Sequence, residues 1–487
     1  MATELYAKAH RKIQDIKGPL LFLDPVADVK FGERVQIVDS EGRQKSGQVL
    51  DVGEDAVIVQ VFEGNDGLDR QGTAVFFTGD IVKLGLSEDM LGRVFGGSGN
   101  PRDGLGEIYP ELERPIGGAP INPVARQQPD EWIETGVTAI DSLFTLIKGQ
   151  KLPIWGGPGL PLNEVTMQVA RQVIRQSEEE LVVVFAGMGI TSREYNYFYS
   201  QFQDSGALAS SVLFLNLADD AAIERTLTPR LALTTAEYFA FDKGRDVLVI
   251  MSDMLNYANA LREISSAREE IPGRRGYPGY LYTDLASIYE RAGVVYGEQG
   301  SVTQMPICTM PNDDITHPVI DLTGYITEGQ IRLSRPLNRE NEFPPIDVLP
   351  SLSRLMDEGV GEGKTRDDHD KLSDQLYALY ARGKELEKLT AIIGSEGLGE
   401  DEQRILTFTE RFESEFVGQG TEPRSIEESL DLAWELLADV PRSELRRVKA
   451  EQIQKYMPQS SGDGAGTSDG SESEGTTAES AAGTSEA

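Results

Sequence analysis

The sequence predicts an α/β protein with three parts: a small N-terminal β-barrel, a central, mostly parallel α/β domain and a C-terminal α-helical domain. Short β-prone runs separated by polar turns fill residues 1–82. Over residues 83–349, continuous apolar runs alternate with amphipathic stretches, which indicates strands buried on both faces of a parallel sheet. The apolar period becomes helical over residues 350–458. Residues 459–487 carry six carboxylates and no cation, and we expect a disordered acidic tail there.

The barrel prediction depends on two β-prone runs and on the turns that bound them. Val35–Val38 and Ala56–Val61 are rich in β-branched residues, which favour strands. Asp39–Gly42 and Glu63–Gly67 supply the Asp, Asn and Gly residues that are typical of turns. The stretch Gly96–Pro120 is rich in glycine and proline, and we expect it to link the barrel to the central domain.

Three apolar runs provide the expected strands of the central sheet, namely Leu181–Phe185, Ser211–Leu215 and Asp246–Met251. Each is far shorter than the roughly 20 residues that a membrane-spanning helix needs. The N-terminal residues Met1–Tyr6 do not resemble a signal peptide. Any association with a membrane is therefore expected to be peripheral.

The C-terminal part shows helical spacing and a helix start signal. Leu372, Leu376 and Leu379 are spaced to lie on one face of a helix. Ser425 precedes Glu428 by three residues, which is the spacing of a capping box. Both signals predict packed helices rather than a further sheet.

Composition excludes several classes of function. The 80 acidic and 46 basic residues give a formal net charge of −34, whereas a nucleic-acid partner needs clustered Lys and Arg. Without the six tail carboxylates the charge is still −34 + 6 = −28, and 15 of the cations are Lys. Molar salt screens such self-repulsion, because the Debye length falls to about 3 Å. We therefore predict a halophilic protein, and the shortage of lysine disfavours an ordinary acidic one.

The few cysteine and histidine residues limit the chemistry further. A single cysteine, Cys308, excludes an intrachain disulfide and fits a reducing compartment. The three histidines are scattered along the chain, so a His-based metal site or a Ser-His-Asp triad is not expected.

The segment Gly156–Asn163 has the place of a phosphate-binding loop without its chemistry. A working P-loop reads G-x-x-x-x-G-K-[ST]: backbone N–H groups wrap the phosphates, Lys reaches the β and γ oxygens, and a hydroxyl binds Mg²⁺. Here the last three positions hold Pro161, Leu162 and Asn163. Leucine cannot neutralise a phosphate and proline has no N–H to donate, so nucleotide binding is expected to be weak. The contacts left to the loop would come from Gly157, Gly159 and Asn163.

An aspartate follows the last of the three predicted strands. Asp253 comes directly after the run that ends at Ser252. In an α/β nucleotide fold, an acidic residue at this place binds Mg²⁺ or a water molecule. An aspartate at the end of a strand also serves as a helix N-cap, so both roles stay open. Because Asp253 comes after the degenerate loop, roughly one βαβ spacing downstream, we expect it to complete the weak nucleotide pocket.

Two motifs make the sequence resemble a known family. Ala186–Glu194 is similar to the A-G-x-G-E-R-x-R-E stretch of the catalytic subunits of rotary ATP synthases. In those subunits the Glu orients the attacking water, whereas here its position holds Ile190 and the next Arg is replaced by Thr191. Pro344–Ser353 fits the P-[SAP]-[LIV]-[DNH]-x-x-x-S-x-S signature of the rotary ATPase α/β superfamily.

Further stretches narrow the resemblance to the B subunit of archaeal and vacuolar (A/V-type) ATP synthases. The similarity extends from about Tyr6 to Pro458. The stretches that carry it are Ile133–Gly136 with Ile140–Asp141, Gly149–Pro153 and Glu269–Tyr280. The resemblance implies that the central domain has a P-loop-type, RecA-like fold, in which Leu162 and Ile190 occupy two lost catalytic positions.

The resemblance also implies a regulatory, non-catalytic subunit with known partners. Three copies would alternate with three catalytic A subunits in a hexameric head, with ATP or ADP at the A–B interface and Mg²⁺ held mainly by the A subunit. Central rotor and peripheral stalk subunits would complete a complex that makes ATP from ADP and phosphate. A transmembrane gradient of protons or sodium ions would drive it. The chain would be peripheral, on the cytoplasmic face of the cell membrane, and would bind no nucleic acid.

Arg354 follows the signature directly, and the resemblance implies that it is an arginine finger. In the rotary family this Arg reaches into the neighbouring catalytic site, where a finger raises the rate of phosphoryl transfer by roughly 10³–10⁵. The alternative is an Arg at a helix start that pairs with a carboxylate such as Asp357, a surface pair that contributes about 0–1 kcal/mol.

Two other functions are kept as alternatives. One is a self-sufficient hexameric NTPase of the secretion or helicase type, which Leu162, Ile190 and the net charge of −34 disfavour. The other is a purely structural scaffold of the head, which differs from the regulatory subunit at Arg354 alone.

Overall fold

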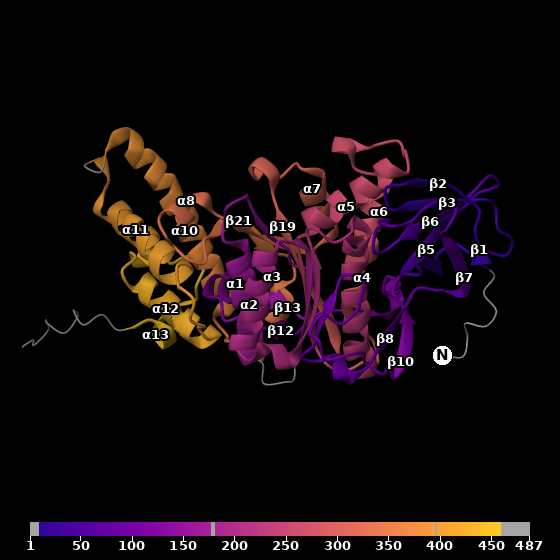
Figure 1. The fold of residues 1–487 in the computed structure, drawn as a ribbon. Helices are drawn as coiled ribbons and strands as arrows, with labels where there is room; N and C mark the ends of the chain where they lie inside the picture. Colours follow the sequence, from indigo (N-terminus) through magenta and orange to yellow (C-terminus); the bar gives the residue numbers. More distant parts are fainter. Residues whose placement is uncertain (1–8, 177–180, 395–396, 459–487) are drawn as a thin grey trace, which may run out of the picture.

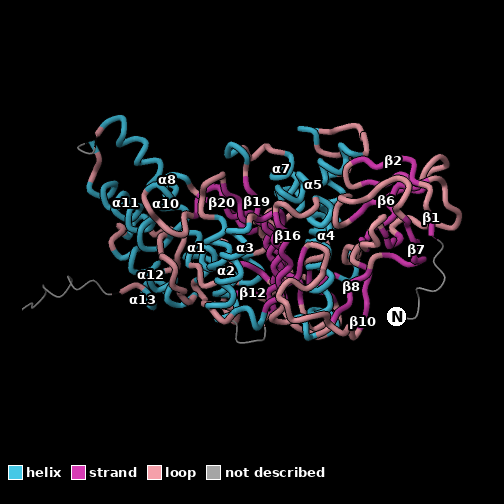
Figure 2. Tube along the Cα trace, in the orientation of Figure 1, coloured by secondary structure: helices cyan, strands magenta, loops and turns pink. Residues whose placement is uncertain are grey.

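The computed structural model describes residues 9–176, 181–394 and 397–458, in three parts that follow one another along the molecule (Figures 1 and 2). The N-terminal β-sheet domain lies at one end, the α/β domain in the middle and the helical domain at the other end. This order confirms the predicted fold class. The predicted acidic tail lies outside the described residues.

The N-terminal domain is a seven-stranded antiparallel sheet in the order β1-β7-β4-β5-β6-β3-β2. Its interior consists of β-branched and aliphatic side chains such as Leu21, Val35 and Val59, each fully buried. The two β-prone runs of the sequence form β4 and β6. The strands are β1 (Ala9–His10), β2 (Ile13–Lys17), β3 (Leu20–Leu23), β4 (Glu33–Val38), β5 (Gln44–Val52), β6 (Val57–Val61) and β7 (Ala74–Ile81).

The central domain contains a ten-stranded sheet whose main path runs β21-β20-β14-β19-β17-β15-β16-β9. The three predicted strands are β15, β17 and β16, and they pair in parallel, as expected. All neighbours along the path are parallel except β20 and β21, which are antiparallel. The bounds are β9 (Val94–Gly96), β14 (Ile154–Gly156), β15 (Val182–Ile190), β16 (Ser211–Leu217), β17 (Val247–Ser252), β19 (Ser301–Thr309), β20 (Gly329–Leu333) and β21 (Ile346–Ser353).

Short strands complete the sheets. β18 (Gly293–Val295) pairs with β11 (Arg126–Gln127) and β19, and β12 (Trp132–Ile133) pairs with β13 (Leu146–Ile147).

The prediction of a linker over Gly96–Pro120 is wrong at Gly96, the last residue of β9, and at Leu112–Pro115, which form β10. β9 ends in this stretch and forms the edge of the central sheet, where the Phe95 ring stacks on Phe214 at 5.2 Å between centroids. β10 (Leu112–Pro115) pairs with β8 (Lys83–Leu86). A Cβ at Gly97 would lie 2.9 Å from the Asn216 Cβ, so this glycine allows close packing rather than flexibility.

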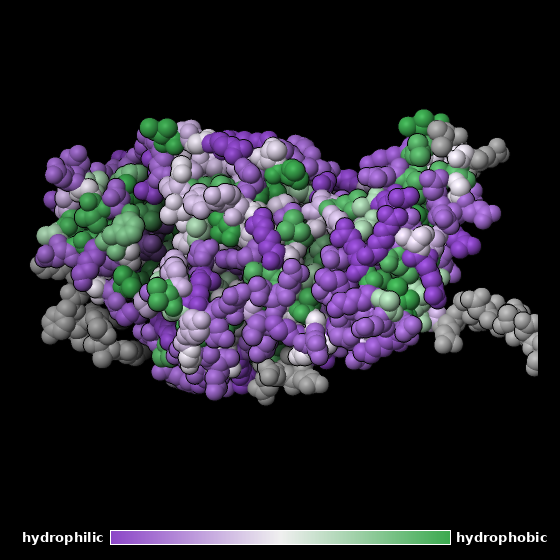
Figure 3. All heavy atoms as spheres, turned by 180° about the vertical axis from the view of Figure 1, so that it is seen from behind, coloured by the Kyte–Doolittle hydropathy of each residue, from purple (hydrophilic) through white to green (hydrophobic). Residues whose placement is uncertain are grey.

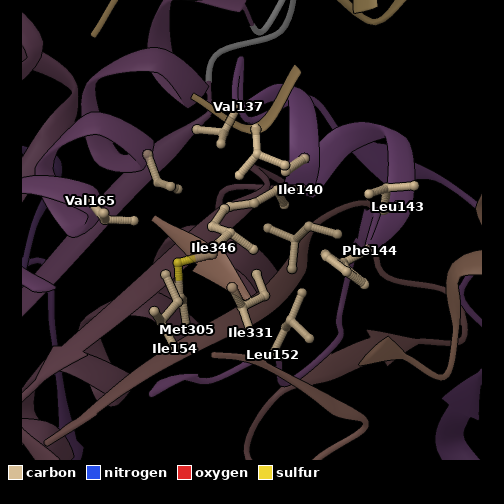
Figure 4. Close-up of a cluster of buried hydrophobic side chains, with 14 of the residues drawn as sticks. Val137, Ile140, Leu143, Phe144, Leu152, Ile154, Val165, Met305, Ile331 and Ile346 are labelled. Carbon is tan, nitrogen blue, oxygen red and sulfur yellow. The ribbon is translucent and has the colours of Figure 1, made fainter. Parts of the chain in front are cut away.

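Helices cover both faces of the central sheet (Figure 1). One face carries α1 (Thr138–Leu143), α2 (Leu162–Gln176) and α3 (Ser192–Asp204). The other carries α4 (Ala222–Glu237), α5 (Met254–Ala267), α6 (Leu281–Tyr289) and α7 (Pro318–Ile326). Figure 4 shows the core beneath α1, where Ile140 points toward Ile331 and Ile346 of the sheet.

The C-terminal domain is helical, as predicted, and shares a hydrophobic core with the first face of the sheet. Leu372, Leu376 and Leu379 are buried, and the capping box is formed: the Ser425 Oγ accepts from the Glu428 N–H, and the Glu428 Oε2 accepts from the Ser425 N–H. The helices are α10 (His369–Ile393), α11 (Glu400–Arg411), α12 (Ile426–Ala438) and α13 (Ala450–Tyr456), preceded by the short α8 (Arg335–Arg339) and α9 (Met356–Gly359).

No helix within the described residues is both long and apolar enough to span a bilayer.

Candidate functional site

The pocket residues predicted from the sequence lie together at one edge of the central sheet. A pocket of about 770 Å³ opens where the parallel strands β14, β15 and β17 end. Ligands of open α/β sheets bind at this edge. The predicted residues that line the pocket are Gly157, Gly159, Leu162, Asn163, Ile190 and Asp253.

Two of these side chains belong to the hydrophobic core rather than to a reacting centre. Leu162 begins α2 and is 8% exposed, and a Cβ at Gly156 would lie 2.8 Å from the Leu162 Cγ. Ile190 ends β15 and is 4% exposed. Where a working site holds a cation and a carboxylate, this pocket has two packed aliphatic groups.

Asn163 and Glu194 connect the degenerate loop to α3. The Asn163 Nδ2 donates to the Glu194 Oε1 at 3.0 Å. The Glu194 Oε2 accepts from the Thr191 N–H at 2.8 Å and from the Thr191 hydroxyl at 2.9 Å, which forms a capping box at the start of α3. Thr191 therefore caps a helix at the position of the family's arginine. The Thr-x-x-Glu spacing could have predicted this role of Glu194, which we missed.

Asp253 forms the N-cap of α5. Its Oδ1 accepts from the Leu255 N–H at 2.7 Å, and its Oδ2 accepts from the Thr309 N–H at 3.0 Å and from the Thr309 hydroxyl. Burial raises the pKa of the Asp253 carboxyl to about 6. The hydrogen bonds favour the charged form and partly oppose this rise. Both oxygens are thus already engaged within the protein. Elsewhere too, the described residues contain no group of three or more His, Cys, Asp or Glu side chains that could hold a metal ion.

An ion pair that the sequence did not predict, between Arg335 and Asp313, lies against the loop. The Arg335 Nε donates to the Asp313 Oδ2 at 2.6 Å, and the Arg335 Nη2 donates to the Pro158 carbonyl at 2.9 Å. The Arg335 guanidinium lowers the pKa of Asp313. A Cβ at Gly157 would lie 1.6 Å from the Asp313 Oδ1, so glycine is needed there because a carboxylate of the protein approaches the backbone. In a phosphate cradle, glycine admits a phosphate in the same way.

Arg354 lies at the opposite edge of the sheet from this pocket. Its N–H donates to the Glu328 carbonyl at 2.9 Å and its Nη1 donates to the Thr327 carbonyl at 3.1 Å, beside the amino end of β20. Glu328 pairs with Lys151, which precedes Gly157 of the pocket by six residues. At about 3.3 Å per residue of strand, Lys151 and Gly157 lie roughly 20 Å apart. The Arg354 side chain therefore does not reach the pocket of its own chain.

The guanidinium of Arg354 is exposed and has no ion pair within the part of the chain that the structure describes. The alternative pair with Asp357 does not form there. One backbone carbonyl, that of Thr327, accepts from the Arg354 side chain.

Known sequence families match consecutive parts of the chain. The ATP synthase alpha/beta family matches with its beta-barrel domain at residues 13–79 and with its nucleotide-binding domain at residues 136–353. The C-terminal domain of V and A type ATP synthase matches residues 358–457. The three matches follow the order of the three structural parts.

Relatives are similar over almost the whole chain. The V-type ATP synthase beta chains of two Thermus thermophilus strains are each 56% identical over 464 residues, covering 94% of this chain and 97% of theirs. The chain belongs to the V/A-type ATP synthase alpha/beta family. Among solved structures, the ATP synthase subunit NeqB from Nanoarcheaum equitans is similar to this V/A-type subunit with a TM-score of 0.70 and 41% identity. That match covers 86% of this chain and 98% of NeqB.

The Arg335–Asp313 pair gives a test of how the loop of this V/A-type subunit is held. Replacing Arg335 with Ala removes the bond to the Pro158 carbonyl, so hydrogen exchange of the backbone amides over residues 157–162 should become faster. The thermal midpoint should hardly change, because the two side chains are 36% and 38% exposed and such pairs contribute about 0–1 kcal/mol. Peptide-resolved hydrogen exchange measures the effect.

The matched control is Arg339→Ala, which removes an exposed arginine from the end of the same helix, α8. If both variants exchange these amides at the wild-type rate, Arg335 does not hold the loop.

Proposed function

We propose that this chain is the regulatory, non-catalytic B subunit of an A-type ATP synthase and that Arg354 acts as an arginine finger in the site of the neighbouring A subunit. One observation carries the proposal. A pocket that lacks the catalytic Lys and Glu lies at one edge of the sheet, and an exposed arginine without an ion pair among the described residues lies at the opposite edge. Membership of the family supports a place in an ATP synthase complex. The positions of the pocket and of Arg354 at opposite edges support a non-catalytic pocket and a finger that acts on a neighbouring subunit.

The pocket supports a non-catalytic role. Turnover of a nucleotide needs a cation on the phosphates, a hydroxyl on Mg²⁺ and a group that orients the attacking water. Leu162, Asn163 and Ile190 occupy those positions, and the Glu194 carboxylate is engaged by Asn163 and Thr191. We propose that the pocket is structural or binds a nucleotide weakly through Gly157, Gly159, Asn163 and Asp253.

The chemistry of the Arg354 side chain supports a role of this chain in phosphoryl transfer on the neighbouring A subunit. A guanidinium presents planar donors that match phosphoryl oxygens, and its charge stays fixed at all accessible pH values. We propose alternating A and B subunits with ATP or ADP at their interface and Mg²⁺ held mainly by the A subunit. Central rotor and peripheral stalk subunits complete the assembly on the cytoplasmic face of the membrane, where a proton or sodium gradient drives synthesis.

Replacing Arg354 with Ala should lower ATP hydrolysis by the assembled A–B head roughly 10³–10⁵-fold, because the transition state loses its charge partner. Assembly should be unchanged, since the side chain is exposed and makes a single bond to a carbonyl within its own chain. Steady-state hydrolysis and native mass of the same preparation measure the two properties.

Arg382→Ala is the control, because it removes an exposed arginine from α10 in the C-terminal domain. Full hydrolysis by the Arg354→Ala head would leave the chain as a structural scaffold. Hydrolysis by the isolated chain would instead favour a self-sufficient NTPase.

We also propose that the protein is adapted to high salt. The formal net charge is −34, and hydrophilic side chains cover most of the face shown in Figure 3. Raising KCl from about 0.1 M to about 2 M should raise the thermal midpoint, because the Debye length shrinks from about 10 Å to below 3 Å and repulsion between surface carboxylates is screened. A midpoint that is equal or lower in high salt would contradict the adaptation.

A chain that ends at residue 458 is the control, since it keeps a charge of −28 and should show most of the same response.

A further inference from the structure

The side chain of Gln150 lies between the two backbone segments that hold Arg354. Gln150 is fully buried, and its Nε2 donates to the Glu328 carbonyl at 3.2 Å and to the Ser353 hydroxyl at 2.9 Å. Ser353 directly precedes Arg354, and the same Glu328 carbonyl accepts the Arg354 N–H. One amide group therefore fixes both β20 and β21 at the point where the arginine leaves the sheet.

The orientation of this amide is determined by its partners. The Gln150 Oε1 accepts from the Ile147 N–H at 3.0 Å, while its Nε2 faces a carbonyl oxygen. A flipped amide would place an NH₂ group against an N–H and an oxygen against a carbonyl, so a single orientation satisfies all groups. The Ser353 hydroxyl donates to the Thr145 carbonyl at 3.1 Å, which leaves its oxygen free to accept from Gln150.

The next residue along the chain fixes the other end of Glu328. The Lys151 N–H donates to the Glu328 Oε2 at 2.9 Å, and the Lys151 ammonium lies 2.7 Å from the Oε1. Lys151 is almost fully buried, and its ammonium also contacts Glu290 at 3.2 Å. Glu328 is thus held at its carbonyl by Gln150 and at its carboxylate by Lys151.

We infer that Gln150 is a positioning residue for Arg354, an inference that depends on the proposed role of Arg354 as a finger. A long, exposed side chain can act on a neighbouring phosphoryl group only if its backbone origin is fixed, because a displacement of about 1 Å at a catalytic group can cost roughly 100-fold in rate. Removing the two Gln150 donors frees Ser353 and the Glu328 carbonyl together. The guanidinium of Arg354 then keeps its charge and its donors, but its position is no longer fixed.

The test is Gln150→Met in the complete chain, assembled with the A subunit. Methionine keeps the length and shape of the side chain and removes both donors, together with the oxygen that accepts from the Ile147 N–H. The kcat of ATP hydrolysis per assembled head should fall about 10–100-fold, while the KM for ATP stays within about twofold, because a finger acts on the charge that develops in the transition state rather than on the bound substrate.

Gln375→Met is the matched control. Gln375 of α10 is also buried, its Nε2 also donates to a carbonyl, that of Glu444 at 3.0 Å, and its Oε1 also accepts from a backbone N–H, that of Arg447 at 2.9 Å. The variant therefore makes a similar chemical change in the C-terminal domain. Its kcat should stay within about twofold of wild type. An equal loss in the two variants would show a general core effect and overturn the inference.

A second background separates positioning from general damage. In heads that carry Arg354→Lys, adding Gln150→Met should lower kcat by much less than it does in wild type, because the finger that Gln150 positions is already impaired. An equal fold-change in both backgrounds would mean that Gln150 acts independently of Arg354. A head with Arg354→Ala that hydrolyses ATP at the wild-type rate would overturn the proposed function itself. An unchanged kcat in Gln150→Met, beside an inactive Arg354→Ala head, would overturn this inference alone.

Discussion

The direction of one strand determines the arrangement of the functional residues. β14, β15 and β17 run parallel, so their carboxyl ends and the loops that follow them meet at one edge of the sheet, where the pocket lies. β21 runs antiparallel to β20, so its last residue lies beside Gly329 at the other edge. Arg354 is therefore delivered away from the pocket of its own chain, which is the arrangement that the proposed arginine finger needs.

The pocket retains the form of a phosphate site, but groups of the protein have replaced the features that would bind phosphate. Leu162 packs against Gly156 in the core, Thr191 caps α3, and the Asp313 carboxylate lies against Gly157. These side chains stabilise the loop and the helix starts, because they provide packing or hydrogen-bond partners from within the chain. This arrangement fits the proposed structural or weakly binding pocket.

The sequence could predict much of the fold, because the signals involved are local. Continuous apolar runs predicted β15, β16 and β17, and the Ser425 to Glu428 spacing predicted a helix start. The strand ends also indicated which residues would share the pocket. The stretch around Gly97 was misread, because a glycine that allows close packing and a glycine in a flexible linker look alike without the neighbouring Asn216.

Contacts between distant segments could not be predicted in this way. Asp313 reaches Gly157, and Gln150 reaches Glu328 and Ser353, across more than 150 residues of chain. No spacing rule links such positions. The sequence alone also does not distinguish a buried glutamine that supports a functional arginine from one that fills a gap in the core. Sequence motifs identified the residues of the site, and the structure identified what holds them.

The most direct measurement of the central claim is the structure of the assembled A–B head with ADP and an aluminium fluoride mimic of the transferring phosphoryl group. The account predicts that the Arg354 guanidinium donates hydrogen bonds of about 2.7–3.0 Å to the mimic bound on the A subunit. A guanidinium that stays on the Thr327 carbonyl, out of contact with a mimic bound on either subunit, would contradict it.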